Sequence, residues 1–208
     1  MMFKPQVPRE HYFKDYDTKE RWISYWYQIN EVLKTRPEKV LEVGIGNKTV
    51  SDYLRKLGIT VVTADVDKSL EPDYVCSVTE LSKYFNENEF DTVLCAEVLE
   101  HIPFEYFEKA LEELWKVSKM YVILSLPHFG VVFSLSLKIP LLKRINITVK
   151  IPLPLRHVFD GQHYWEVGKK GYSLGNILKI LSKLFYIKKT YIVPENPYHR
   201  FFILRVRK

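Results

Sequence analysis

The sequence predicts an α/β protein built on a doubly wound, mostly parallel sheet. Short apolar runs that are typical of buried strands alternate with amphipathic helical patterns along the chain. The first run, Lys39 to Val43, passes directly into Gly44-Ile45-Gly46 and then into a helical pattern from Thr49 to Leu57. A strand that continues through glycines into a helix places free backbone N–H groups at the turn. This arrangement predicts a nucleotide-type cofactor site at the turn.

An aromatic arm and a helix precede that first strand. Residues 1–16 are irregular and rich in aromatic side chains and proline, and Asp17 or Thr18 can cap a helix that runs to about Thr35. Pro37 then ends the helix. We expect most rings of the helix to pack on the sheet and one aromatic residue of this region to cover the cofactor site. The apolar residues at helical spacing are Trp22, Tyr25, Trp26, Ile29 and Leu33, and the candidate covers are Tyr12, Tyr16 and Trp26.

The rest of the chain continues the alternation and completes a sheet of seven strands. A compact turn joins the last two strands, as expected of a terminal antiparallel hairpin. Ligands of such sheets bind at the carboxyl ends of the strands, where Gly44, Asp65, Ser77, Ala96 and Pro127 fall. The later strands are expected at Ile59–Ala64, Tyr74–Val78, Phe90–Ala96, Met120–Leu126, Ile187–Val193 and Phe201–Val206, and the helical segments at 49–57, 81–85, 104–118 and 174–185.

Composition indicates one globular domain over residues 1–208, because 47% of the 208 residues are hydrophobic and 27% are charged. Cys76 and Cys95 each lie inside a strand-like run, so no disulfide framework is implied. The N-terminus lacks the continuous apolar segment of a signal peptide. The longest apolar stretch, Phe129 to Leu142, is too short to span a bilayer. A cytoplasmic location fits these features best.

The net charge of +6 is unevenly distributed. Residues 1–115 hold 14 Lys and Arg against 22 Asp and Glu, whereas residues 116–208 hold 17 against 3. This asymmetry indicates either a solvated basic face or an anionic partner near the C-terminal half. The basic residues are not interleaved with a recognisable base-stacking platform, which argues against nucleic acid as the partner.

Three motifs lie in order on the expected strands: LEVGIGNKT from Leu41, TADVD from Thr63 and FDTVLCAEVLEHIP from Phe90. Together they resemble the class I S-adenosylmethionine-dependent methyltransferases, which have a Rossmann-like fold. The segments RWISYWYQI and HYWEVGKKGYS, with SLP after the fifth strand, resemble a bacterial and archaeal branch whose substrates are mostly unassigned. Such motifs often carry a third glycine, and here Lys48 stands in that place.

The resemblance implies S-adenosylmethionine as the cofactor. Asp65 would bond the ribose hydroxyls, which agrees with elementary chemistry because carboxylate oxygens at a strand tip match two vicinal donors. The methionine and ribose side would contact Glu42 and the turn Gly44-Ile45-Gly46. The adenine would lie on Val66 with Ser77 and Val78 at its edge, and Ala96 and Glu97 would flank the methionine end.

Within the single domain, residues 1–36 form the N-terminal arm and helix. Residues 128–170 lie where this fold builds its substrate cover. The segment is apolar without a clean period, so it could be a hydrophobic lid or a surface that touches a membrane through 129–157, and we expect the lid. The spacing of His157, Asp160 and His163 supports a metal only weakly, so we expect a hydrogen-bonded loop cluster and no metal. The candidates for facing the methyl acceptor are His128, His163, Tyr164 and Glu166.

The sequence thus predicts a methyltransferase whose acceptor is small and anionic or partly hydrophobic, because apolar walls in a positive field concentrate such molecules. Glu97, Glu100 and His101 are interpreted as a structural strand-to-helix turn rather than as an acid–base group. Two other interpretations stay open, a non-catalytic S-adenosylmethionine-binding regulator and a nicotinamide-dependent oxidoreductase. The segment EVLEHIP after the fourth strand argues against the second of these.

Overall fold

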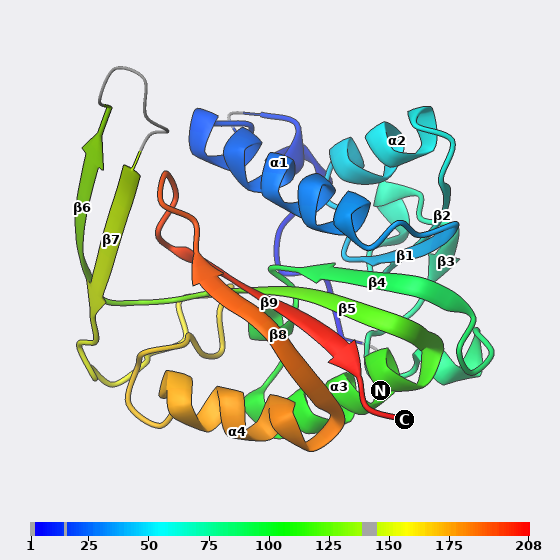
Figure 1. The fold of residues 1–208 in the computed structure, drawn as a ribbon. Coiled ribbons are helices and arrows are strands. Elements are labelled where there is room, and N and C mark those ends of the chain that lie inside the picture. The colour runs from blue at the N-terminus through cyan, green and yellow to red at the C-terminus, as the bar shows by residue number, and fades with distance from the viewer. Residues whose placement is uncertain (1–2, 15, 139–144) are drawn as a thin grey trace.

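The computed structural model describes residues 3–14, 16–138 and 145–208. Its centre is a seven-stranded sheet in the order β3-β2-β1-β4-β5-β9-β8, drawn in Figure 1. The five strands from β3 to β5 are parallel, and β9 and β8 are antiparallel to their neighbours. The predicted fold class is therefore confirmed. The strands are β1 (Lys39–Val43), β2 (Thr60–Asp65), β3 (Tyr74–Val75), β4 (Phe90–Ala96), β5 (Ser118–Pro127), β8 (Phe185–Ile192) and β9 (His199–Val206).

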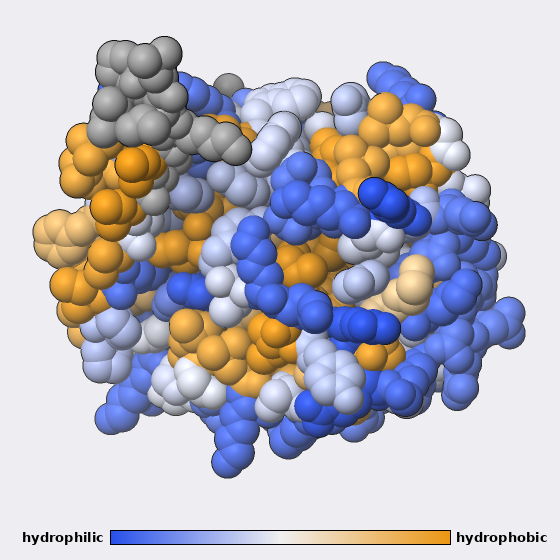
Figure 2. Space-filling view, viewed as in Figure 1, coloured by the Kyte–Doolittle hydropathy of each residue, from blue (hydrophilic) through white to orange (hydrophobic). Residues whose placement is uncertain are grey.

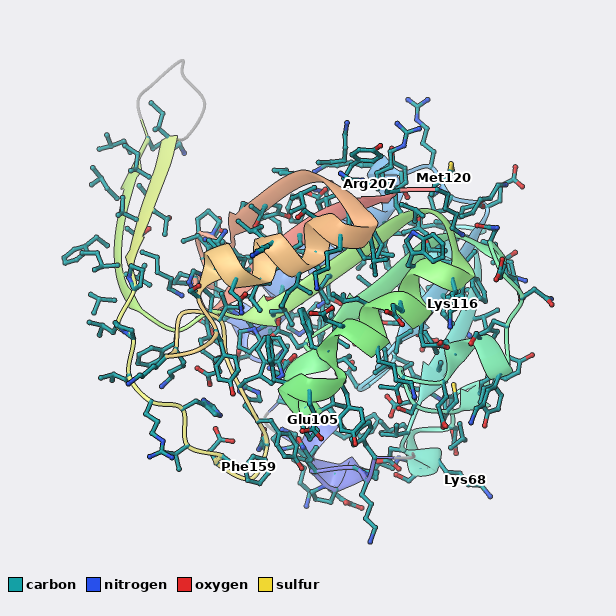
Figure 3. All side chains as sticks on the ribbon, turned by 90° about the horizontal axis from the view of Figure 1, so that it is seen from below. Lys68, Glu105, Lys116, Met120, Phe159 and Arg207 are labelled. Carbon is teal, nitrogen blue, oxygen red and sulfur yellow. The ribbon has the colours of Figure 1, made fainter. Side chains whose placement is uncertain are left out.

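Helices cover both faces of the sheet and enclose two apolar layers. On one face, Val32 and Leu54 pack against Val40 and Phe201 of the sheet. The other face lies under two helices that run side by side in Figure 3, which views the molecule from below. The first face carries α1 (Lys19–Lys34) and α2 (Thr49–Lys56), and the second carries α3 (Phe107–Val117) and α4 (Leu174–Leu184). Short 3-10 helices occupy Arg9–Tyr12, Lys68–Leu70, Leu81–Lys83, Leu99–His101 and Phe104–Tyr106.

The third strand is shorter than predicted. It ends at Val75 because the chain then turns, and the turn is held by side chains. The Ser77 hydroxyl accepts from the backbone N–H of Thr79 at 3.2 Å and shares a hydrogen bond of 2.9 Å with its hydroxyl. Local bonds of this kind compete with the strand ladder. By contrast, the first and fourth strands have the predicted bounds.

The face that α1 buries differs from the predicted one. Tyr25 is buried as expected, but Trp22 and Trp26 are 54% and 56% exposed. Ser24 lies against the sheet instead, because its hydroxyl bonds Nδ1 of His199 at 2.8 Å. Ser24, a polar residue with a buried hydrogen-bond partner, thus packs on the sheet where the spacing of apolar residues had predicted an aromatic ring.

Residues 131–151 contain a separate two-stranded antiparallel ribbon that projects from the edge of the molecule (Figure 1). It pairs β6 (Val131–Leu137) with β7 (Ile145–Ile151), and the register sets Phe133 opposite Val149 and Leu135 opposite Ile147. Alternate residues of a strand share one face, so one side of the ribbon is apolar along its whole length. These apolar residues are 41–61% exposed, and Figure 2 shows apolar surface there. Among the described residues, no helix combines the length and hydropathy needed to cross a membrane.

We predict that this apolar face contributes little to the stability of the fold. Replacing both Phe133 and Leu135 by serine should leave the melting temperature within about 2 °C of the parent, because their side chains are 61% and 53% exposed. Binding of a fluorescent hydrophobic dye to the folded protein should fall. Phe202→Ser is the matched control, since it empties a fully buried site in β9 and should lower stability by about 3 kcal/mol or more. A large loss of stability in the double variant would contradict the prediction.

Candidate functional site

A cavity of about 260 Å³ lies at the carboxyl ends of β1, β2 and β4. This is the edge at which parallel α/β sheets bind their ligands. All ten residues predicted to bind the cofactor line this cavity. They are Glu42, Gly44, Ile45, Gly46, Asp65, Val66, Ser77, Val78, Ala96 and Glu97.

The turn after β1 depends on its first glycine. Gly44 has φ +80°, and a Cβ atom there would lie 2.2 Å from a methyl group of Val98, the residue after Glu97. No other residue fits this approach, so the glycine brings the turn after β1 against the turn after β4. Lys48, in the place of the third glycine, also has a left-handed backbone with φ 64° and directly precedes α2. The lysine therefore keeps the conformation that glycine adopts most easily.

Asp65 joins the turns after β1 and β2. One carboxylate oxygen accepts from the backbone N–H of Ile45 at 2.8 Å, and the other accepts from that of Asp67 at 2.8 Å. Burial raises the pKa of Asp65, and these backbone bonds oppose that shift. A carboxylate has about four acceptor positions, so positions remain for donors on a ligand.

Glu42, on β1, has a buried carboxyl group that is only partly hydrogen-bonded. Its side chain is buried, and the Oε2 atom has no hydrogen-bond partner in the part of the chain that the structure describes. Burial raises the pKa of Glu42 to about 8, although Ser51 and Arg55 favour the charged form. Such a group fits a ligand that brings a positive charge or a hydrogen-bond donor.

The N-terminal arm closes one side of the cavity. Tyr12 and Tyr16 line it, and their rings meet edge to face at 5.2 Å. The Tyr12 ring lies 3.5 Å from the position that a Cβ on Gly46 would take, which places the ring directly over the glycine turn. Trp26, the third predicted cover, does not line the cavity.

The opposite end of the cavity is formed by the turn after β4. Glu97 has a left-handed backbone with φ 53°, and Ser125 of β5 holds it there. The Ser125 hydroxyl donates to Glu97 Oε1 at 2.8 Å, and the Glu97 N–H donates to the Ser125 carbonyl at 3.1 Å. His199 Nε2 lies 3.6 Å from the second carboxylate oxygen. A non-glycine residue in this strained conformation points to function.

Glu100 and His101 also line the cavity, beside His163. Burial raises the pKa of Glu100 well above its ordinary value, and the neighbouring Glu97 raises it further. Burial lowers the pKa of His101 to about 4, with a smaller effect from His163, so this imidazole is neutral at neutral pH. The segment interpreted as a purely structural turn therefore also presents ionisable groups to the cavity.

The four residues predicted to face the acceptor occupy different places. His163 lines the cavity, and its Nδ1 lies 3.2 Å from Glu166, which also accepts from Tyr198 at 2.7 Å. His128 and Tyr164 do not line the cavity. His128 instead accepts a hydrogen bond from the Arg200 guanidinium at 2.8 Å. The backbone N–H of Tyr164 donates to the Glu100 carbonyl, and the Tyr164 ring stacks on Phe159, which is labelled in Figure 3.

Several cavity residues were not predicted from the sequence. Gln6, Arg21, Tyr198 and His199 all line the cavity, yet they lie far from the motifs after the strands. The only available signal was the aromatic and polar character of the arm and of the turn before β9.

The central part of the chain resembles a known protein family. Residues 41–124 match the sequence profile of a family described as "Methyltransferase domain". No curated protein sequence matches the chain.

Solved structures share the fold over nearly the whole chain. A Burkholderia thailandensis 1,6-didemethyltoxoflavin N1-methyltransferase with bound S-adenosylhomocysteine has a TM-score of 0.64 at 16% identity, with 96% of this chain and 85% of that one covered. A Synechocystis magnesium protoporphyrin IX methyltransferase with bound S-adenosylmethionine has a TM-score of 0.61 at 15% identity, with 96% and 90% covered. A Bradyrhizobium japonicum N-methyltransferase with bound S-adenosylhomocysteine has a TM-score of 0.59 at 10% identity, with 92% of this chain and 90% of that one covered.

The strand order and the strand-end cavity define a Rossmann-like fold with a cavity where such sheets bind their ligands. More particularly, the chain has the fold of the S-adenosylmethionine-dependent methyltransferases among these structures, and its residues 41–124 resemble the methyltransferase-domain family. The family resemblance of the sequence is thereby confirmed. The branch with unassigned substrates stays a prediction.

We predict that Glu42 makes the fold less stable as the pH rises. Its pKa is about 8 in the folded chain against an ordinary 4.5, so the unfolded chain loses this proton first and stability falls between pH 4.5 and 8. Glu42→Gln should therefore gain stability relative to the parent, by at least about 1 kcal/mol between pH 5 and pH 8. Thermal melts at several pH values measure this difference.

Glu113 provides the control of opposite sign. Burial opposes ionisation, but hydrogen bonds from Lys116 and Ser82 lower the pKa of Glu113 below its ordinary value. Glu113→Gln should be destabilised at neutral pH and approach the parent in acid. A gap between Glu42→Gln and the parent that does not change with pH would contradict the prediction.

Proposed function

We propose that this protein transfers the methyl group of S-adenosylmethionine to a small-molecule acceptor. The observation that carries the proposal is the convergence of Glu42, Asp65 and Glu97 on one strand-end cavity of a methyltransferase fold. The cofactor, when bound, supplies an activated sulfonium methyl group. The residues of the chain would then bind, orient and exclude water rather than create the reactivity.

The cofactor side of the cavity fits this group residue by residue. Glu42 Oε2 has no hydrogen-bond partner among the described residues, and it would accept from the ammonium group of the methionine moiety. Asp65, anchored by the Ile45 N–H, would accept from the ribose hydroxyls. Val66 would lie under the adenine, with Ser77 and Val78 at its edge. Gly44, Ile45, Gly46 and Ala96 would complete the walls.

The acceptor would enter at the end that Glu97 and His163 line. Glu97 is fixed by Ser125, and the His163 ring is oriented by Glu166, so both groups keep one position relative to the methyl donor. Fixed positions of this kind raise the rate of a transfer step. A base is required only if the acceptor atom carries a proton.

The acceptor was predicted to be partly hydrophobic or anionic, and the structure bears on these two properties differently. No described residue of the apolar ribbon formed by β6 and β7 lines the cavity, so the partly hydrophobic acceptor rests on the composition of the segment alone. The exposed apolar face of the ribbon keeps the membrane-surface contact predicted for 129–157 open to test. The anionic character was predicted from the basic C-terminal half, of which Lys143 and Arg144 lie outside the described residues. Arg156 does not line the cavity. Of the described residues in that half, Gln162, His163, Tyr198 and His199 line it.

The first test is cofactor affinity. Titration calorimetry should detect binding of S-adenosylmethionine and S-adenosylhomocysteine, and Asp65→Ala should weaken it at least tenfold, about 1.5 kcal/mol, the scale of a hydrogen bond to a charged group. Asp73→Ala is the matched control, because Asp73 also braces β2, by accepting from Thr63 at 2.9 Å, but does not line the cavity. Its affinity should match the parent. Binding of NADH in place of either ligand would support the oxidoreductase interpretation and refute ours.

The second test is transfer itself. With radiolabelled cofactor and extracts separated into small acidic metabolites, lipids, RNA and protein, we expect label in a small-molecule fraction. Asp65→Ala should need more cofactor to reach the same rate, because its defect is in cofactor binding. Cofactor binding without transfer to any fraction would instead support the regulator. Label in RNA or protein alone would refute a small-molecule acceptor.

A further inference from the structure

We propose that Glu100, His101 and His163 form a binding site for a divalent transition-metal ion at the acceptor end of the cavity. This site is separate from the cofactor residues. It can be tested in the absence of cofactor, so its failure would leave the proposed methyl transfer standing.

The three side chains are already close enough for ligation. One possible ligand atom from each lies within 4.8 Å of the other two. His101 Nε2 is 3.9 Å from Glu100 Oε1, and the rings of His101 and His163 are 5.1 Å apart. Bonds of about 2.1 Å to a common ion place neighbouring ligand atoms roughly 3.5 Å apart, so small side-chain rotations suffice.

Hydrogen bonds orient the His101 imidazole as a ligand. Its Nδ1 lies 2.6 Å from Gln6 Oε1 and 3.1 Å from the Gln162 carbonyl oxygen. A carbonyl oxygen only accepts, so Nδ1 carries the proton and Nε2 keeps its lone pair on the side of Glu100. Gln6 is fixed in turn, because its amide donates to the His101 carbonyl at 3.0 Å. Metal-binding histidines commonly have their second nitrogen held in this way.

His163 is held by a carboxylate. Its Nδ1 lies 3.2 Å from Glu166 Oε1, which also accepts from the Tyr198 hydroxyl at 2.7 Å. The carboxylate fixes the proton on Nδ1 and leaves Nε2 available to an ion. A carboxylate–histidine pair of this kind raises the basicity of the free nitrogen and orients the ring.

Glu100 is the observation that calls for a cation. Its side chain is fully buried, and neither carboxylate oxygen has a hydrogen-bond partner in the described ranges. A buried carboxylate without a partner is strongly destabilising, and a coordinated ion would remove that penalty.

A second group of possible ligands, Asp160, His163 and Glu166, shares one histidine with this site. Asp160 Oδ1 already accepts from two backbone N–H groups, at 2.9 and 2.8 Å, and Glu166 is engaged by Tyr198. The satisfied carboxylates therefore favour the group that contains Glu100.

The three ligand atoms restrict the kind of metal ion and leave part of its coordination sphere free for another ligand. Two imidazole nitrogens and one carboxylate suit zinc, iron(II), cobalt(II) or manganese(II), whereas calcium and magnesium prefer oxygen alone. Three protein ligands leave at least one coordination position for a water molecule or an oxygen of the acceptor, as in catalytic rather than structural sites. The site lines the same cavity as Glu97.

The test uses the full chain without a polyhistidine tag, treated with a chelator and then titrated with cobalt(II) and zinc(II). We expect one ion per chain, visible absorption bands for cobalt, and competition by zinc. Glu100→Gln, His101→Ala and His163→Ala should each weaken binding at least tenfold, because each removes a ligand. His11→Ala is the control, since this histidine lines the cavity but does not belong to the group.

A stability readout separates loss of a ligand from loss of the fold. Without metal, Glu100→Gln should melt above the parent, because it removes an unpaired buried carboxylate. With saturating zinc the parent should gain stability and the variant should not. Binding that is unchanged in all three ligand variants, or binding abolished by Asp160→Asn but kept in Glu100→Gln, would overturn the assignment.

Discussion

The burial of carboxyl groups at the carboxyl edge of the sheet is the constraint on which the site depends. Glu42 and Glu100 are both withdrawn from water, and both keep oxygen atoms without a partner among the described residues. Asp65 differs because backbone N–H groups from two turns satisfy it. A fold keeps groups of the first kind against their energetic penalty where a ligand supplies the missing charge or donor. Under the proposed function, these two carboxyls would face the two ends of the ligand, one at β1 and one after β4.

Backbone geometry holds these groups in place. Gly44 allows the turn after β1 to contact Val98, and Glu97 takes a left-handed conformation that Ser125 stabilises with two hydrogen bonds. Together they fix the distance between the β1 and β4 turns. A side chain at position 44 would separate the turns, and a loss of the Ser125 hydroxyl would release Glu97. The cofactor end and the acceptor end of the cavity are thus mechanically linked through the same pair of turns.

The features that could be predicted from the sequence were those set by local periodicity, namely single strands and the residues at their ends. The strands before Gly44 and Glu97 and the acid after β2 follow from apolar runs and from the rule that ligands bind at strand ends, and all ten predicted cofactor residues line one cavity. The ribbon of β6 and β7 also alternates with period two, so the prediction of an apolar segment without a clean period was wrong there. Residues such as Gln6 and His199 could not be placed, because only tertiary folding brings the arm and β9 to the cavity.

The overall charge of the chain gives a poor description of the charge in the site. The chain carries +6, yet among the described residues five carboxyl groups and two cations, Lys4 and Arg21, line the cavity. Burial raises the pKa of Glu42 and Glu100, yet the lining still offers an anionic acceptor no excess of positive charge. A divalent ion on Glu100, His101 and His163 reverses this local balance at the acceptor end alone. With the proposed ion bound, a carboxylate, phosphate or hydroxyl oxygen of an acceptor would have a positive partner in the cavity that Glu97 lines, and the anionic acceptor predicted from composition would be compatible with the lining of the cavity.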